Sequence, residues 1–366
     1  MELRENLVIK QNDKYLLLNL YNLRKEYLDE KEFLKLKDFI LVGNLLGEQL
    51  FCDLAKKGQF LSKKEIASID LFARVQGKKL SKKILCEIQM SLSFECNLLC
   101  YYCYQKGKDK NNRMKRNDID KIYKFCEKYE KETNTINNIE LITISGGEPL
   151  LEGNIELINY IAEKFKGSKL RILTNGINLK RYWKSLPLHR IDEVQVSLDG
   201  DDEIIAKISG KEKLHCYTDI IEGVHMVAAS GRKVKIATVL TEASSERVKK
   251  VFFLLEKAGL LKYKNLDICF SLITDYKNEL GIASQYELLE LVNEARKIRE
   301  VVKLYRLYKN VEVNFFSDLI RLKSILKDRY DADRMYVGRS CGRLHGIGIT
   351  VIPTGEIYWC NERIGE

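Results

Sequence analysis

The chain has 366 residues, which is long enough for two or three domains. Apolar residues make up 45% and charged residues 31%, as in ordinary soluble proteins, and no low-complexity tract interrupts them. The net charge of +10 is spread along the chain and no nucleic-acid recognition motif accompanies it. This charge therefore indicates a lysine-rich solvated surface rather than an acidic partner such as a peptide or RNA.

Nothing in the sequence indicates membrane insertion or secretion. No apolar run approaches the roughly 20 residues that cross a bilayer. The N-terminus, Met1–Glu5, lacks the apolar segment of a secretory signal. We therefore expect a cytoplasmic protein with no membrane partner. Its ten cysteines would be reduced there, so clustered cysteines are better interpreted as metal ligands than as disulfides.

The first 82 residues predict a hairpin followed by three short helices. Two apolar runs flank a polar turn, which is typical of a hairpin. Asp29 and Glu32 have the spacing of a capping box, in which each side chain accepts from the other residue's backbone amide. The predicted elements are strands at Leu7–Lys10 and Tyr15–Leu20 and helices that begin at Asp29, run from Leu46 to Lys56, and begin at Ser62.

From residue 86 to about 272 the pattern alternates between strand and helix. Such alternation predicts an α/β fold with a parallel sheet flanked by helices, whose ligands bind at the carboxyl ends of the strands. The predicted strands are Cys86–Leu92, Ile139–Ser145, Lys169–Thr174, Glu193–Leu198, Val234–Leu240 and Leu266–Leu272. The predicted helices are Asp118–Lys131, Ile155–Phe165, Tyr217–Ser230 and Ser245–Ala258.

Three cysteines, Cys96, Cys100 and Cys103, follow the first of these strands in a CxxxCxxC spacing. Soft sulfur ligands select zinc, copper(I) or an iron–sulfur cluster. Zinc would need a fourth close ligand, and the residues up to Lys110 offer neither cysteine nor histidine. A 4Fe-4S cluster held by three cysteines keeps one iron open for chemistry.

Three further segments follow at the ends of predicted strands: Ser145–Pro149 (SGGEP), Thr174–Gly176 (TNG) and Ser197–Gly200 (SLDG). With the three cysteines, and in this order, they make the chain resemble the radical S-adenosylmethionine (SAM) enzymes. The resemblance implies a partial (β/α)6 barrel, a 4Fe-4S cluster on the three cysteines and SAM at its open iron. In this family a reductant of the flavodoxin or ferredoxin type supplies an electron, and SAM is cleaved to a 5'-deoxyadenosyl radical that abstracts hydrogen from the substrate.

The resemblance also implies a set of SAM-binding residues. It places one tyrosine beside the adenine, a Gly-Gly-Glu segment around the amino group, and two strand-end residues near the ribose or carboxylate. These residues are Tyr102, Gly146, Gly147, Glu148, Asn175 and Ser197. From the residues alone, Glu148 could instead cap the following helix, and Asn175 and Ser197 could be polar strand ends that bind water.

The sequence leaves two questions undecided in this region: the role of Asp199 and the residue that holds the SAM carboxylate. Asp199 is a candidate acid–base residue, and it is equally suited to the turn before Gly200. Many relatives have an Arg-Gly pair after this motif, and its arginine helps to hold the SAM carboxylate. This chain has Ser209-Gly210 at that place. Lys207 or Lys211 could replace that arginine, although an ammonium group is not an equivalent fork-shaped donor.

The C-terminal part is predicted as a helical linker, residues 276–335, and a cysteine-bearing segment, residues 336–366. In the latter, Cys341 and Cys360 surround a predicted hairpin turn at Pro353–Gly355. This spacing is similar to the opening of the SPASM extension, which carries auxiliary 4Fe-4S clusters, and the alternatives are a zinc half-site or a coincidental spacing. Two thiolates cannot complete a four-cysteine cluster, so we expect any auxiliary cluster to be absent or incompletely ligated in this chain.

The order of these parts indicates a peptide-modifying enzyme. The pattern of residues 1–82 is similar to the winged-helix domain that binds leader peptides, with a structural cap as the alternative, and residues 83–275 form the radical SAM core. We expect an enzyme that forms thioether or carbon–carbon cross-links in a ribosomally made, cysteine-rich precursor peptide with a leader. One alternative is formylglycine formation, as in anaerobic sulfatase-maturing relatives. Another is an iron–sulfur or zinc binding protein without turnover.

Overall fold

The structure is a computed structural model of the chain. It describes residues 6–11, 13–19, 25–42, 53–54, 85–103, 105, 107–133, 139–211, 215–240, 244–272, 294, 297–298, 300–305, 311–313 and 348–358. Several predictions lie outside these ranges: the helix from Ser62, Cys341, Cys360, and nearly all of the helix from Leu46 and of the linker at 276–335. Within them, no helix combines the length and apolar character that crossing a bilayer requires.

The chain divides into two compact units. Unit 1 contains Met1–Val75, Lys277–Glu300 and Asn314–Ser340. Unit 2 contains Gln76–Tyr276, Val301–Val313 and Cys341–Glu366. The cysteine motif and the three strand-end motifs all belong to unit 2.

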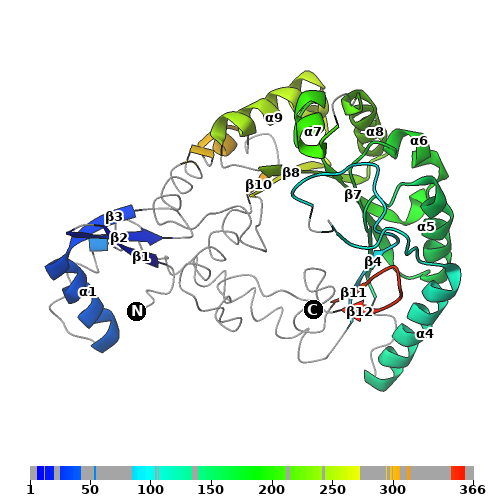
Figure 1. The fold of residues 1–366 in the computed structure, drawn as a ribbon, viewed down its shortest axis with the longest axis horizontal. Coiled ribbons are helices and arrows are strands. Elements are labelled where there is room, and N and C mark those ends of the chain that lie inside the picture. The colour runs from blue at the N-terminus through cyan, green and yellow to red at the C-terminus, as the bar shows by residue number, and fades with distance from the viewer. Residues whose placement is uncertain are drawn as a thin grey trace. The chain divides into compact units, whose positions relative to one another are not determined.

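Unit 1 contains a three-stranded antiparallel sheet and a helix (Figure 1). Strands β1 (Asn6–Gln11) and β2 (Lys14–Asn19) form the predicted hairpin, and β3 (Lys25–Asp29), which was not predicted, pairs with the other side of β2. Helix α1 (Glu30–Val42) follows directly. Its capping box is confirmed, since Glu32 N donates to Asp29 Oδ1 at 2.8 Å and Asp29 N donates to Glu32 Oε2 at 3.0 Å.

Unit 2 is built on one large sheet whose described strands have the order β10-β9-β8-β7-β6-β5-β4-β11-β12. The strands are β4 (Glu87–Ser91), β5 (Leu141–Ser145), β6 (Lys169–Thr174), β7 (Ile191–Ser197), β8 (Lys233–Leu240), β9 (Leu266–Leu272), β10 (Val311–Val313), β11 (Gly348–Val351) and β12 (Ile357–Tyr358). The helices are α4 (Arg116–Thr133), α5 (Glu152–Lys164), α6 (Leu179–Tyr182), α7 (Asp202–Ser209), α8 (Tyr217–Ala229) and α9 (Ser245–Lys257), with 3-10 turns η2 (Trp183–Ser185), η3 (Leu188–Arg190) and η4 (Leu260–Lys262).

The predicted α/β fold, a parallel sheet flanked by helices, is confirmed in this unit. Strands β4 to β9 pair in parallel with their neighbours, and all six of them and the four predicted helices form within a few residues of the predicted bounds. Helix α7 and strands β10 and β11 were not predicted. The two strands are too short to show a periodic pattern, and each adds in parallel to one end of the series, β10 to β9 and β11 to β4. The hairpin predicted around Pro353–Gly355 joins β11 to β12.

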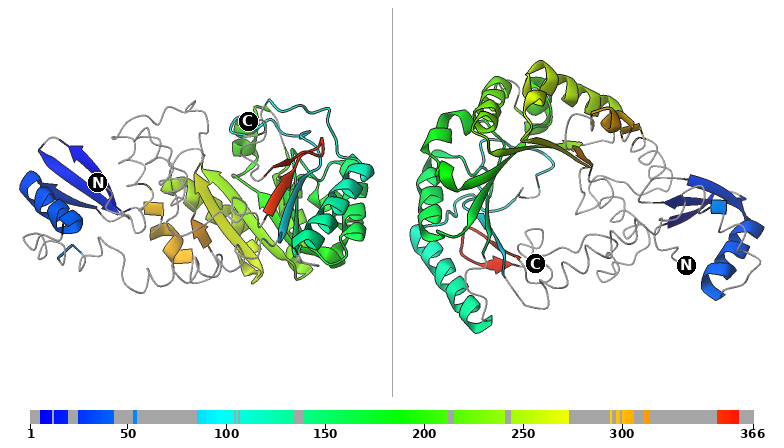
Figure 2. Two further views of the ribbon diagram at one scale, coloured as in Figure 1. Left: turned by 90° about the horizontal axis from the view of Figure 1, so that it is seen from below. Right: turned by 180° about the vertical axis from the view of Figure 1, so that it is seen from behind.

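The two faces of this sheet differ in character. Residues of one face, such as Val194 and Ile236, are completely buried, and Figure 2 shows the helices covering that outer side of the curved sheet. Residues that alternate with them, such as Gln195 and Lys235, are half-buried on the inner, concave face. The hydrophobic core therefore lies between the sheet and its helices, and the inner face stays polar.

The carboxyl ends of β4 to β8 lie along one edge of the sheet because these strands run in parallel. We call this edge the motif edge. It is defined by the last residues of these strands: Ser91, Ser145, Thr174, Ser197 and Leu240. All four sequence motifs begin at it or follow it directly.

Candidate active site

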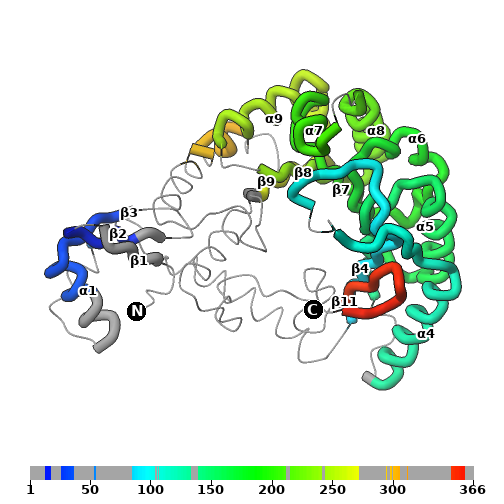
Figure 3. The backbone as a smooth tube through the Cα atoms, in the orientation of Figure 1, coloured from blue at the N-terminus to red at the C-terminus, as the bar shows by residue number. Residues whose placement is uncertain are grey.

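The three clustered cysteines lie on the loop that leaves β4 at the motif edge, residues 92–103, here called the cysteine loop. Their thiols are free and partly exposed. Two hydrogen bonds join this loop to the region of α7: Tyr101 N donates to Ile208 O at 3.1 Å and Lys211 Nζ donates to Asn97 O at 2.6 Å. Figure 3 shows the loop, in cyan, running from β4 toward α7. The loop is therefore fixed at its middle and near its far end.

The environment of the loop keeps the thiols of Cys96 and Cys100 protonated when no metal is bound. Burial raises the pKa of Cys96, and burial together with the Asp199 carboxylate raises the pKa of Cys100 to about 12. Metal binding would have to displace these protons, because the thiolate is the ligand. Among the described residues no three Cys, His, Asp or Glu side chains are grouped closely enough for a single metal ion. An iron–sulfur cluster needs its cysteines farther apart than a single metal ion does, because each cysteine binds a different iron.

Two glycines after β5 allow the next loop to lie against the cysteine loop. Gly146 has φ +134°, and a Cβ atom there would overlap the carbonyl oxygen of Ser93. A Cβ atom on Gly147 would overlap the carbonyl oxygen of Glu95. Two backbone hydrogen bonds of 2.8 Å close the contact, from Gly147 N to Ser93 O and from Glu148 N to Glu95 O. The Gly-Gly pair is therefore required by a close approach of two backbones.

Glu148 is buried and connects two strand ends. Its carboxylate accepts from Leu150 N at 2.8 Å, Thr174 Oγ1 at 2.7 Å and Asn175 N at 2.8 Å. Burial raises its pKa to about 7, although these three donors favour the charged form. Glu148 does not cap helix α5, because the N-cap residue of that helix is Leu151 and no side chain caps it; Glu148 instead holds the loop after β5 to the end of β6.

Asn175 brings the end of β6 to the cysteine loop. Its Nδ2 donates to Asn97 Oδ1 at 2.7 Å and lies 3.8 Å from Cys96 Sγ. Sequence analysis did not single out Thr174 or Asn97 as site residues. The signal for Thr174 was a polar residue at the end of an apolar strand, directly before the Asn-Gly turn.

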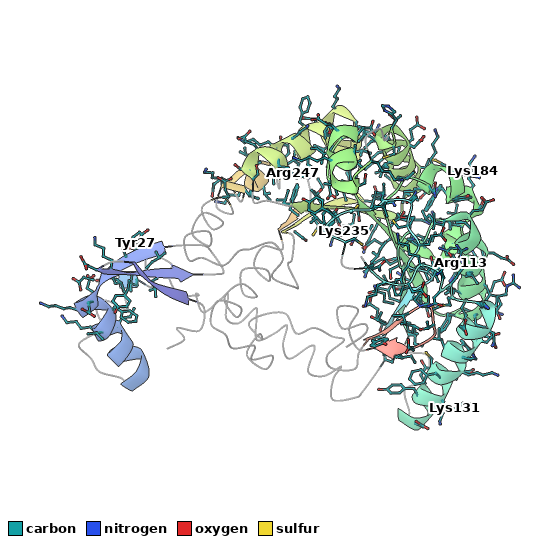
Figure 4. The ribbon with its side chains drawn as sticks, viewed as in Figure 1. Tyr27, Arg113, Lys131, Lys184, Lys235 and Arg247 are labelled. Atoms are coloured by element: carbon teal, nitrogen blue, oxygen red, sulfur yellow. The ribbon has the colours of Figure 1, made fainter. Side chains whose placement is uncertain are left out.

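Asp199 is buried at the end of the next strand and binds the cysteine loop through Tyr102. The Tyr102 hydroxyl donates to Asp199 Oδ2, and Val239 N donates to Oδ1 at 2.7 Å. Burial raises the pKa of Asp199, and burial together with the Asp199 charge raises the pKa of Tyr102. Arg247, labelled in Figure 4, donates to the Asp199 carbonyl oxygen at 3.4 Å. This geometry suits a residue that positions the loop, and the acid–base role of Asp199 stays a prediction.

The remaining candidates have simpler surroundings. Ser197 is exposed at the end of β7, where a ligand could reach it. Of the two lysines considered as replacements for an arginine, Lys207 is exposed on α7, whereas Lys211 contacts the cysteine loop at Asn97. The structure thus brings every described site candidate, except the exposed Ser197 and Lys207, into one set of contacts around the cysteine loop. Cys341 and Cys360 stay outside the described residues.

Comparison with known families agrees with this geometry. Residues 90–255 match the family model of the Radical SAM superfamily, and this range contains the cysteine loop and all three strand-end motifs. Residues 90–255 are a radical SAM domain. The cofactors of this family are a 4Fe-4S cluster and SAM.

A sequence relative of the chain has a different described activity from the peptide modification that we expected. The probable GTP 3',8-cyclase of Methanococcus aeolicus is 34% identical over 139 residues, which are 36% of this chain and 44% of that protein. The chain therefore spans less than half of this relative.

Solved structures with a similar fold include two radical SAM proteins with bound peptides. Streptococcus suis SuiB bound to precursor peptide SuiA has a TM-score of 0.54 and 19% identity, and the match covers 99% of this chain and 83% of that one. The anSMEcpe protein with bound AdoMet and Kp18Cys peptide has a TM-score of 0.54 and 18% identity, over 76% of this chain and 75% of that one. At these identities the similarity concerns the fold.

The residues of the radical SAM domain fit its two cofactors. Three free thiols on one loop are the soft ligands that an iron–sulfur cluster takes. Gly146 and Gly147 pack against the backbone of the cysteine loop, so the residues that the resemblance assigns to SAM lie next to the loop that carries these thiols. Cys96, Cys100 and Cys103 would hold the cluster, and Glu148, Asn175 and Ser197 would bind SAM.

Proposed function

We propose that the protein is a radical SAM enzyme that modifies a ribosomally made precursor peptide in the cytoplasm. The observation that carries the proposal is the joining of the cysteine loop to the Glu148 and Asn175 loops at one edge of the sheet. When bound there, the cluster and SAM supply a carbon radical that removes hydrogen from a substrate. The protein's own residues orient this chemistry: Glu148 fixes the end of β6, and Tyr102 and Asp199 fix the cysteine loop.

A peptide substrate is supported by the fold of unit 1 and by the similar structures. Strands β1 and β3 are the outer strands of the described three-stranded sheet. An extended leader peptide could add to one of these edges through main-chain hydrogen bonds. The similarity to peptide-bound SuiB extends over nearly the whole chain. We propose a cysteine-rich peptide, cross-linked through a thioether or carbon–carbon bond, and a flavodoxin or ferredoxin as reductant.

A second candidate function is GTP 3',8-cyclisation. It is favoured by the 34% identity to the probable GTP 3',8-cyclase over 139 residues. The two candidates share the radical and differ only in the substrate that meets it. The products therefore decide between them.

The test begins with anaerobic reconstitution of the full chain with iron and sulfide, followed by SAM and a strong reductant. We expect wild-type protein to form 5'-deoxyadenosine and a Cys96→Ala variant to form none, because that variant loses a cluster ligand. A Cys126→Ala variant is the matched control, since Cys126 is buried on α4, away from the cysteine loop. Equal product from wild type and Cys96→Ala would contradict radical SAM chemistry at this site.

Substrate candidates are tested next, peptides by co-expression and GTP with the reconstituted protein. Co-expression with short open reading frames that adjoin the gene should yield a peptide that has lost a hydrogen pair, as a cross-link requires. Gain of a formylglycine aldehyde would identify sulfatase-type maturation instead. Conversion of GTP to its 3',8-cyclic product, with every adjoining peptide unmodified, would favour the second candidate.

A further inference from the structure

Lys211 follows helix α7, whose last turn holds the far part of the cysteine loop. Ile208 O, a carbonyl of that turn, accepts from Tyr101 N at 3.1 Å. Gly210 then ends the helix with φ +67°, a backbone angle that glycine adopts without strain. The chain turns there, and Lys211 comes to lie against the cysteine loop, where it is half-buried.

A single peptide group connects the Lys211 ammonium to the sulfur of Cys96. Lys211 Nζ donates to Asn97 O at 2.6 Å, and this carbonyl belongs to the peptide bond between Asn97 and Leu98. The N–H of the same peptide bond, Leu98 N, donates to Cys96 Sγ at 3.4 Å. A cation that binds a peptide oxygen polarises the peptide and makes its N–H a stronger donor. The ammonium therefore strengthens the hydrogen bond to the Cys96 sulfur.

Two buried carboxylates, Glu148 and Asp199, are bonded to residues that contact the cysteine loop or belong to it. Glu148 accepts from the backbone of Asn175, and Asp199 accepts from the hydroxyl of Tyr102. A negative charge near the cysteine sulfurs disfavours an electron added to a group bound there, because like charges repel. The ammonium of Lys211 acts in the opposite sense and favours the added electron.

The reduction potential of an iron–sulfur cluster depends on the charge around it and on hydrogen bonds to its sulfurs. We propose that Lys211 raises the reduction potential of the cluster on Cys96, Cys100 and Cys103. The reductant of the proposed function gives up one electron and the cluster gains it, and no bond is made or broken. Lys211 is a positioning residue, since it acts through the Asn97–Leu98 peptide. This inference rests on the proposed function, because it takes a redox-active cluster as the group on these cysteines.

The test is a redox titration of the reconstituted full chain without SAM, in which electron paramagnetic resonance measures the reduced fraction of the cluster at set potentials. In Lys211→Gln we expect the ratio of reduced to oxidised cluster at a given potential to fall about tenfold, which lowers the midpoint of a one-electron couple by about 59 mV. Lys211→Arg should stay close to wild type, because arginine keeps the charge and the donors.

Lys207→Gln is the matched control. It makes the same charge change on an exposed lysine of α7, where solvent and salt screen the charge, so the midpoint should not move. A midpoint in Lys211→Gln equal to that of wild type would overturn the inference. So would equal shifts in Lys211→Gln and Lys207→Gln, because the contact with Asn97 would then have no special effect.

Partial loading of a variant does not hide the shift, because the ratio is measured among chains that hold a cluster. A Lys211→Gln chain that holds no cluster at all would also overturn the inference, since Lys211 would then be needed to hold the loop and not to set the potential. 5'-Deoxyadenosine formation with SAM and a strong reductant is measured in the same preparations. If wild type forms none, the proposed function fails. If wild type forms it and the Lys211→Gln midpoint is unchanged, only the inference about Lys211 fails.

Discussion

At the scale of single residues, Glu148 shows how one buried carboxylate can organise a site. Three donors satisfy it, yet burial still raises its pKa to about 7. The sequence indicated the importance of this residue through the SGGEP motif. It did not indicate the hydrogen bonds to Thr174 and Asn175, because these come from the neighbouring strand and depend on the register of β5 and β6.

The raised pKa of Glu148 predicts a pH dependence of stability in the metal-free chain. Below pH 4.5 both folded and unfolded chains hold the proton, and between 4.5 and about 7 only the folded chain keeps it. The free energy of unfolding therefore falls as pH rises through this window and levels off above it, by about 3 kcal/mol in all. Glu148→Gln, which cannot titrate, should lack this fall.

Urea unfolding of wild type and Glu148→Gln at several values between about pH 5 and pH 8 measures this difference. Glu163→Gln is the control, because Glu163 is an exposed residue on the same helix that follows the loop. Parallel pH profiles for wild type and Glu148→Gln would show that the folded chain does not retain this proton.

At the scale of elements, most of the fold could be predicted because long alternating runs leave a clear pattern. The hairpin β1–β2, the capping box of α1 and the strands β4 to β9 all formed as expected. Helix α7 was missed although Asp201, whose side chain accepts from Ile204 N, supplies a cap signal. The place of strand β11 beside β4 could not be predicted, because it depends on a pairing between residues more than 250 positions apart.

The contact between the cysteine loop and the Gly-Gly segment predicts the effect of one added methyl group. Gly147→Ala should place a Cβ atom against the carbonyl oxygen of Glu95 and push the two loops apart. We expect a loss of about 1–3 kcal/mol in unfolding free energy and less iron bound per chain after reconstitution. Gly167→Ala should change neither quantity, because no atom lies within 4 Å of a Cβ there. An iron content equal to wild type in Gly147→Ala would contradict this account of the loop.

At the scale of the whole molecule, the division into two units separates the cofactor site from the N-terminal sheet. Every described residue that we assign to the cluster or to SAM belongs to unit 2, whereas β1, β2, β3 and α1 belong to unit 1. A ligand that binds only the folded form of one unit stabilises that unit. The assignment of the site can therefore be checked without knowing the substrate.

We predict that SAM stabilises unit 2 of the reconstituted protein and leaves unit 1 unchanged. At a free SAM concentration of about 100 times Kd, the gain should be about 2.7 kcal/mol. Hydrogen exchange read on peptides from β4 to β9 should slow accordingly, while peptides from α1 should exchange at the same rate with and without SAM. The Cys96→Ala variant, treated identically, should show no SAM effect in either unit. Equally slowed hydrogen exchange in α1 and in the sheet of unit 2 would contradict this prediction. It would mean that the two units open together and that SAM binding stabilises both.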